Sequence, residues 1–164
     1  MGTWKRWTPH PRNILVDTNL LVLFAVGSCE PQMIPRHKRT NQFRVDDYHL
    51  LEEYLRQFRS VMTTPNVLTE VSNLVDQIDE KAGRLLQERL GKVIGVLDEH
   101  YAPSSELSQV EEFPRLGLAD SSILRFAGKD RIVLTDDIHL YLALQKRGLP
   151  SVNFHHLREL AWES

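Results

Sequence analysis

The chain has 164 residues, of which 41% are hydrophobic and 26% are charged, and its formal net charge is −2. These values are typical of one globular domain and exclude a disordered or fibrous chain. The balance of 20 Lys and Arg against 22 Asp and Glu also excludes a protein that coats nucleic acid through bulk positive charge, although it allows a local basic patch.

Cysteine content and hydropathy predict the compartment. A single cysteine, Cys29, excludes an intramolecular disulfide and favours a reducing environment, where we expect it to act as a small packing residue. The longest apolar run, Leu20 to Val26, is far shorter than the roughly 20 residues of a membrane span. The first ten residues lack the apolar segment of a signal peptide. We therefore expect a cytoplasmic protein with no membrane partner.

The first half of the chain alternates short apolar runs with helical spacing. Gly27 is expected to end the first helix, and Thr64 to cap the third, with Pro65 in its first turn. In chain order, these patterns predict a strand at 13–17, a helix at 20–26, a loop at 28–41, a helix at 46–58, a strand at 61–64 and a helix at 65–78.

The second half continues this alternation, with Gly128 and Gly148 as helix stops. It predicts a helix at about 81–100, a loop between Pro103 and Pro114, a helix at 118–127, a strand at 131–135, a helix at 138–146 and a strand at 151–154. Strands interleaved with helices predict an α/β fold, a three-layer α/β/α sandwich with a central parallel sheet. We expect residues 1–164 to form one domain, with an N-terminal arm at 1–12.

Acidic side chains follow two of the predicted strands. Asp17 ends the strand at 13–17, and Asp136 and Asp137 follow the strand at 131–135. In an open α/β sheet, ligands bind beyond the carboxyl ends of the strands. If the sheet is parallel, segments from opposite ends of the chain therefore bring these acids to the same edge.

Two further acids occupy predicted helices. Glu70 lies beside the apolar stripe of the helix that begins at Pro65, and Asp120 has apolar neighbours at helical spacing. A carboxylate in apolar surroundings is costly to bury unless a cation or hydrogen bonds satisfy it. Gly117, Ser121 and Ser122 leave space around Asp120.

Each acid has an ordinary alternative role when it is taken alone. Asp17, Asp120 and the pair Asp136–Asp137 could cap helices, and Glu70 could be a solvated surface residue. Gathered carboxylates, however, repel one another and require a compensating cation. Oxygen ligands without Cys or His select Mg²⁺ or Mn²⁺ over zinc, and such a site suits hydrolysis of phosphate esters.

Four segments resemble, in the same order, the motifs of PIN-domain nucleases. They are Ile14-Leu-Val-Asp-Thr-Asn19, Thr64-Pro-Asn-Val-Leu-Thr-Glu-Val71, Gly117-Leu-Ala-Asp120 and Val133-Leu-Thr-Asp-Asp137. Each motif is weak alone, but four in order, spread over about residues 14–154, are a strong signal. The resemblance implies a PIN-like fold and a metal-dependent endoribonuclease that cuts single-stranded or structured RNA.

The resemblance also implies the roles of individual residues. The acids that match the catalytic, metal-binding set for Mg²⁺ or Mn²⁺ are Asp17, Glu70, Asp120 and Asp137. Asp136 is implied as an auxiliary metal ligand or as a group behind the ligands. The residues that would orient these carboxylates through hydrogen bonds are Thr18, Asn19 and Thr135.

Many small bacterial PIN domains are toxins of toxin–antitoxin pairs, so the resemblance implies an antitoxin as one candidate protein partner. It also implies a candidate homodimer, because PIN domains often dimerise. The chain departs from the most compact toxins in one respect, a longer insertion at 28–60 between the first two acids.

Basic residues in this insertion are candidates for approaching RNA. The candidates, which lie in a predicted basic loop at 28–45, are Arg36, Lys38, Arg39 and Arg44. The N-terminal arm adds basic residues interleaved with aromatic ones, namely Trp4, Lys5, Arg6, Trp7 and Arg12. Neutralised phosphates and stacked bases are the usual means of binding single strands. The alternatives are a solvated loop and tryptophans that pack on a surface.

Other readings of the sequence remain open. A PIN fold could serve as a non-catalytic module that binds nucleic acid or protein, and a structure-specific DNA nuclease would use the same metal chemistry. A receiver domain is disfavoured because the acidic pair comes late, and an Asp-x-Asp phosphatase because Asn19 replaces the second Asp. His139, His155 and His156 lack the spacing of a zinc site and are expected at surface or packing positions.

Overall fold

The structure, a computed structural model, describes residues 13–163, so the expected arm at 1–12 with its tryptophans and basic residues lies outside the described part. Five strands form one sheet in the order β3-β2-β1-β4-β5, and every neighbouring pair is parallel. The strands are β1 (Asn13–Val16), β2 (Ser60–Thr63), β3 (Asp98–Glu99), β4 (Arg131–Thr135) and β5 (Ser151–Asn153).

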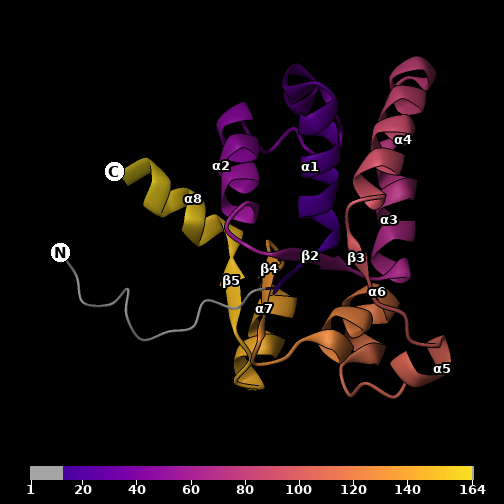
Figure 1. Ribbon diagram of the computed structural model, residues 1–164, viewed down its shortest axis with the longest axis vertical. Coiled ribbons are helices and arrows are strands. Elements are labelled where there is room, and N and C mark those ends of the chain that lie inside the picture. The colour runs from indigo at the N-terminus through magenta and orange to yellow at the C-terminus, as the bar shows by residue number, and fades with distance from the viewer. Residues whose placement is uncertain (1–12, 164) are drawn as a thin grey trace.

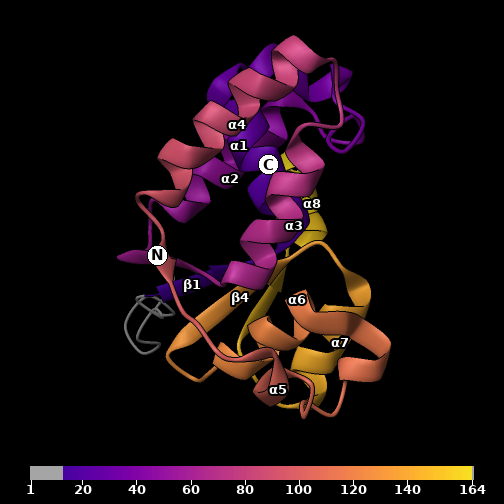
Figure 2. The ribbon, with the colours of Figure 1, turned by 90° about the vertical axis from the view of Figure 1, so that its right-hand side faces the viewer.

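Helices cover the sheet in two groups. In Figure 1 one group stands above the strands and consists of α1 (Thr18–Cys29), α2 (Val45–Leu55), α3 (Pro65–Val75) and α4 (Glu80–Ile94). The group below consists of α5 (Ser104–Leu107), α6 (Phe113–Phe126) and α7 (Ile138–Lys146). Figure 2 shows the same separation from the side, which confirms the predicted three-layer α/β/α sandwich.

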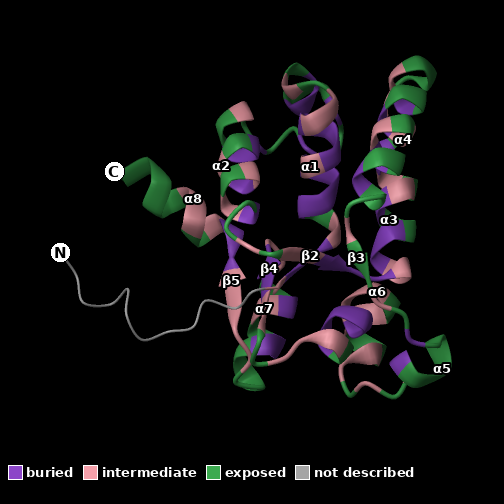
Figure 3. Ribbon diagram, viewed as in Figure 1, coloured by how far each residue is buried: buried purple, intermediate pink, exposed green. Residues whose placement is uncertain are grey.

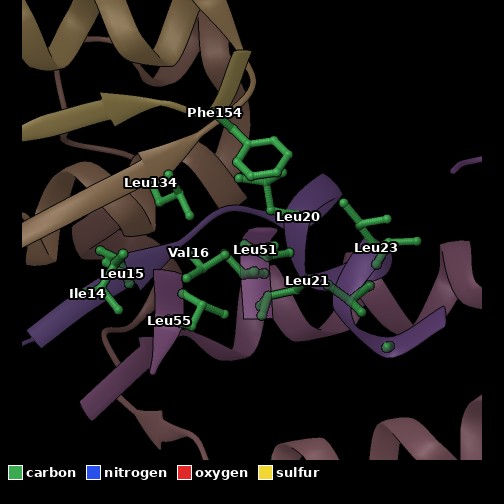
Figure 4. Packing of buried hydrophobic residues seen from close by; sticks show 14 of the residues in the cluster. Ile14, Leu15, Val16, Leu20, Leu21, Leu23, Leu51, Leu55, Leu134 and Phe154 are labelled. Carbon is green, nitrogen blue, oxygen red and sulfur yellow. The ribbon is translucent and has the colours of Figure 1, made fainter. Parts of the chain in front are cut away.

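The centre of the sheet is fully apolar because helices cover both of its faces. Ile14, Leu15 and Val16 of β1 pair in register with Ile132, Val133 and Leu134 of β4. The β1 residues have no exposed surface, and side chains from β1, α1, α2 and Phe154 join one core (Figure 4). The continuous apolar run that predicted a buried strand therefore reflects burial on two faces.

Gly27 does not end its helix, contrary to the sequence prediction. Helix α1 continues to Cys29, and Gly27 is buried within it. A Cβ atom at this position would lie 2.2 Å from the ring of Tyr48 on α2, which is closer than real side chains allow. The glycine is therefore explained by close packing of α2 against α1 and not by the end of a helix.

The segment predicted as a basic loop is also more ordered than expected. Residues Pro31–Arg36 form the 3₁₀ helix η2, and the Thr40 hydroxyl donates a hydrogen bond of 2.7 Å to the Ile34 carbonyl. His37 is fully buried, and its ring bonds the Val75 carbonyl at the end of α3 over 2.8 Å. These interior contacts fix the backbone of the segment, while its basic side chains face solvent.

Two further differences concern short or exposed elements. Helix α4 ends at Ile94, and the next residues give the exposed two-residue edge strand β3 instead of more helix. Helix α8 (Phe154–Glu163) was not predicted, and its far end is exposed (Figure 3). Gly117 breaks α6 with a φ of 83°, so its regular part begins at Leu118, as predicted.

The topology places a crevice at the carboxyl ends of β1 and β4. The chain moves outward from β1 to β2 and β3, then returns to β4 on the other side of β1. Where strand order reverses in this way, the helices that follow the two central strands leave from opposite faces and open a crevice. Within residues 13–163, every helix is too short or too polar to cross a lipid bilayer.

Candidate active site

A cavity of about 600 Å³ opens at this edge of the sheet. Four carboxylates from four separate elements line it: Asp17 after β1, Glu70 on α3, Asp120 on α6 and Asp137 after β4. The four acids that the sequence singled out as catalytic candidates therefore share one cavity. They are separated by up to 120 residues in the chain, and the parallel topology brings them together.

Asp17 is held more firmly than a surface carboxylate. It is only 4% exposed and caps α1, where its Oδ1 atom accepts a hydrogen bond of 3.3 Å from the Leu20 amide. Its Oδ2 atom accepts a hydrogen bond from the Thr135 hydroxyl and another, of 3.2 Å, from the Asp136 amide. Burial and the nearby Asp136 charge raise its pKa well above the usual range, although these hydrogen bonds oppose the shift.

Thr135 links the two central strand ends. Its buried hydroxyl donates to Asp17 and accepts a hydrogen bond of 2.9 Å from the Asp137 amide. Asp137 caps α7 through its Oδ1 atom, which accepts from the His139 and Leu140 amides. One threonine side chain thus fixes the carboxylate after β1 relative to the turn that follows β4.

Asp136 has a different position from its neighbour. It is not among the residues that line the cavity, and its Oδ1 atom accepts a hydrogen bond of 3.5 Å from Asn19. Burial raises its pKa, and the ring of His155 partly offsets this effect. Its expected role as an auxiliary ligand stays a prediction, whereas its contact with Asn19 agrees with an orienting role for that residue.

Asp120 is the least satisfied of the four acids. No hydrogen bond or ion pair with any other residue of 13–163 stabilises its charge. Burial, together with the charges of Asp137 and Glu70, raises the pKa of Asp120 to about 7. Glu70 is exposed, and its Oε2 atom accepts a hydrogen bond of 3.4 Å from Thr18.

The donor set of the cavity fits a hard divalent cation. All four candidate ligands offer carboxylate oxygens, and no cysteine or histidine of the described residues lines the cavity, which favours Mg²⁺ or Mn²⁺. The side chains surround the cavity without converging: within residues 13–163, no three Asp, Glu, His or Cys groups meet closely enough to hold a metal ion. Mutual repulsion of like charges opposes such convergence, and a cation would reverse that repulsion.

Of the four predicted RNA-binding residues, the structure brings only Arg39 to the cavity. The Arg39 amide donates a hydrogen bond of 3.0 Å to Nδ1 of His37. The other ring nitrogen, Nε2, therefore carries the proton and donates to the Val75 carbonyl over 2.8 Å. A buried histidine thus anchors Arg39 near the C-terminal end of α3, which the sequence alone did not indicate.

The remaining basic candidates lie elsewhere on the segment. Arg36 and Lys38 are exposed and line no part of the cavity. Arg44 immediately precedes α2, and its guanidinium lies over the ring of Trp162 at 4.6 Å. Contact of these three residues with RNA stays a prediction.

Several polar and aromatic cavity residues were not singled out from the sequence. They are Asn66, Thr69, Tyr101 and Ser104. Asn66 and Thr69 lie in the segment 64–71 that resembles a PIN-domain motif, but only Glu70 of that segment is a predicted site residue. Tyr101 and Ser104 lie outside all four motif segments, and Tyr101 falls between the helix predicted at about 81–100 and the loop predicted from Pro103. Their shared position follows from α3, β3 and α5 meeting at one place, which no local pattern could signal.

Comparison with models of protein families gives no match for this chain, and comparison with curated proteins gives none either.

Proposed function

We propose that the protein is a divalent-metal-dependent nuclease that hydrolyses RNA phosphodiester bonds. One observation carries the proposal: Asp17, Glu70, Asp120 and Asp137 line one cavity at the edge where the strand order reverses. A cavity that gathers four acids, and in which no residue of 13–163 pairs with Asp120, favours a cationic cofactor over a structural role. The resemblance of the four acid-bearing segments to PIN-domain motifs supports RNA as the substrate.

The four acids would hold Mg²⁺ or Mn²⁺ through their oxygen atoms. When bound, such an ion supplies the Lewis acidity that phosphodiester hydrolysis needs. Asp17 and Asp137 are oriented for this role because Thr135 bonds both the Asp17 carboxylate and the Asp137 backbone. Thr18 positions Glu70 in the same way.

The charge of the cavity also constrains how RNA approaches it. Four carboxylates repel a phosphate backbone, so a basic side chain at the cavity is needed to guide the strand. Arg39 provides it, because it lines the same cavity as the acids and is anchored through buried His37. We expect Arg39 to contact a phosphate next to the bond that is cleaved.

The direct test is a cleavage assay on labelled single-stranded RNA with Mg²⁺ or Mn²⁺ and an EDTA control. Wild type is compared with Asp17→Asn, which keeps the size and the α1 cap but removes the charge. We expect a loss of about 100-fold or more, since even groups that only orient ligands contribute 10- to 100-fold. Asp46→Asn, an exposed acid outside the cavity, is the matched control and should cleave normally.

The same assay separates the alternatives. Cleavage of single-stranded or flap DNA in preference to RNA would identify a DNA nuclease. A folded wild type that cleaves neither polymer and shows no Mn²⁺ binding by calorimetry would contradict the proposal and favour a non-catalytic binding module. Equal activity of Asp17→Asn and wild type would contradict the assignment of the site.

A further inference from the structure

The cavity runs along α3 for most of the length of the helix. Five of its lining residues, Pro65, Asn66, Thr69, Glu70 and Leu74, follow helical spacing from the first turn of α3 to its last. Leu74 is nine residues beyond Pro65, a distance of roughly 13 Å along the helix axis at 1.5 Å per residue. The length exceeds several-fold the rise of about 3.4 Å per nucleotide of a stacked strand, so the cavity can follow more than one nucleotide.

The two ends of this cavity carry different side chains. Arg39 lies at the end near Leu74, because His37 bonds Val75 and Arg39 bonds His37. Tyr101 lies at the other end: the amide of the preceding residue, His100, donates a hydrogen bond of 2.9 Å to Thr63, just before α3 begins. Along α3, Glu70 lies between the end with the cation and the end with the aromatic ring, and the other three acids line the same cavity.

Tyr101 combines a fixed backbone with a free ring. Its neighbour Ala102 is buried and lines the cavity, and the His100 ring bonds Asp98 over 3.0 Å and lies against Phe126. The Tyr101 side chain is 73% exposed and makes no hydrogen bond or ring contact with any residue of 13–163. An aromatic ring held in this way at a cavity is ready to stack without reordering the chain.

The cavity also has an apolar wall that metal and phosphate chemistry does not require. Leu74, Ala102, Leu116 and Leu118 line it together with the acids. A ligand that uses both surfaces needs a charged part and a flat apolar part, which describes a nucleotide with an unpaired base. A base that is stacked and paired inside a duplex cannot offer its face to a protein ring.

We propose that Tyr101 stacks on an unpaired nucleobase, so that a single RNA strand runs along α3 from Tyr101 past the four acids to Arg39. This inference rests on the proposed function and names its substrate class as single-stranded RNA. Tyr101 acts here by binding the strand and takes no part in the bond cleavage.

The experiment compares wild type, Tyr101→Ala, Tyr101→Phe and Val96→Ala on a labelled single-stranded RNA and on an RNA hairpin stem. Val96 is the matched control, an 80% exposed apolar residue five positions earlier in the chain. For Tyr101→Ala we expect KM on the single strand to rise about 10-fold with kcat unchanged, as for loss of one base–aromatic stack. Tyr101→Phe and Val96→Ala should remain within about 2-fold of wild type, because the ring or the site is intact.

A second readout does not depend on cleavage. In an Asp17→Asn background with Mg²⁺, fluorescence anisotropy measures binding of the same RNA with one abasic nucleotide placed at each position in turn. With Tyr101 present, one abasic position should weaken binding about 10-fold. With Tyr101→Ala, that position should lose its effect, a non-additivity that a merely structural role would not produce.

The outcomes separate the stacking role of Tyr101 from the proposed nuclease function on which it rests. Normal cleavage by Tyr101→Ala with unchanged KM would overturn the stacking role and leave the nuclease intact. Absence of cleavage by wild type would overturn the nuclease, and the abasic scan would still decide whether Tyr101 binds a strand. An abasic profile that is the same with Tyr101 and with Ala at this position would overturn the inference in either case.

Discussion

Two regions of the molecule bury carboxylates in opposite ways. At the junction of α2 and α8, Asp47 is fully buried, and its Oδ1 atom accepts a hydrogen bond of 2.9 Å from the Arg158 guanidinium. Its Oδ2 atom accepts a second bond, of 2.8 Å, from the Arg44 amide. In the cavity, Asp17 is almost as deeply buried but has only neutral donors, and Asp120 has no partner within residues 13–163.

The contrast is one of charge: the carboxylate buried between α2 and α8 has a cationic partner from the chain itself. Burying an unpaired charge is costly, and α8 provides Arg158 to remove that cost at Asp47. At the cavity, residues 13–163 provide no ion-pair partner for Asp17 or Asp120, and burial together with the charges of neighbouring acids raises the pKa of both. A bound cation, as in the proposed function, would compensate these two carboxylates.

Breaking the ion pair between Asp47 and Arg158 should have the largest effect on stability. Arg158→Met leaves Asp47 buried without its cation, which is expected to cost about 3–5 kcal/mol. For a chain of this length we expect the melting temperature to fall by about 10 °C, measured by circular dichroism at neutral pH.

The double variant Asp47→Asn with Arg158→Met is the control for this prediction. It removes both charges together and keeps a polar group near the Arg44 amide, so it should recover most of the loss. Similar stability of Arg158→Met and wild type would contradict the structural role assigned to this pair.

Thr135 allows a test of how the carboxylates of the cavity are held in position. Thr135→Val keeps the shape but removes the donor to Asp17 and the acceptor for the Asp137 amide. We expect metal-dependent cleavage to fall about 10- to 100-fold. The rate should also rise at a higher pH than in wild type, since Asp17 loses a hydrogen bond that favours its charged form.

Thr135→Ser is the matched control, because it keeps the hydroxyl and should retain activity. If Thr135→Val and Thr135→Ser lose activity equally, packing of the missing or added methyl group would explain the effect and the orienting role would be refuted.

Asp120→Asn should give the smallest change in thermal stability. Unlike Arg158→Met, it should stabilise the protein. The pKa of Asp120 in the folded protein is about 7, above its ordinary value of 3.8, so the folded state binds more protons between these values. Stability therefore falls as pH rises from about 4 to 7 and stays low above 7. Asn removes this penalty, and the melting temperature in EDTA at pH 8 should rise by about 3 °C, or about 1 kcal/mol, since partial exposure to water limits the effect.

The gain from Asp120→Asn should vanish below about pH 4, where the wild-type carboxyl is also neutral in both states. Addition of Mg²⁺ or Mn²⁺ should stabilise wild type more than the variant, because the variant lacks one of the four acids. A destabilised Asp120→Asn variant at pH 8 would contradict the uncompensated charge at this position.

Local patterns were sufficient for the elements that are buried or clearly capped. Strand β4 has the predicted bounds, and α3 begins at Pro65 with its Thr64 cap, because an apolar run and a cap are local signals. Strand β3 was missed because an exposed two-residue edge strand has no apolar signature. Gly27 was read as a helix stop because the sequence does not reveal that the ring of Tyr48 packs on it.

The four acids of the cavity were also predicted from the sequence, since each lies at a strand end or in a motif. The structure places all four on one cavity and leaves Asp136 outside its lining. Arg39 was one of four basic candidates, and only the buried contact of His37 with Val75 sets it apart from the others. Tyr101 could not be predicted because its position depends on where β3 and α5 pass α3.

The sequence by itself determined the alternation of strands and helices and the acidic character of the candidate residues, because apolar periodicity and charge are properties of the residues alone. Only the tertiary structure decided which charges are compensated, since Asp47 and Arg158 are 111 residues apart and meet through packing of α8 on α2. It also decided which side chains share the cavity, because the sheet order places β4 beside β1 and opens the crevice between their helices.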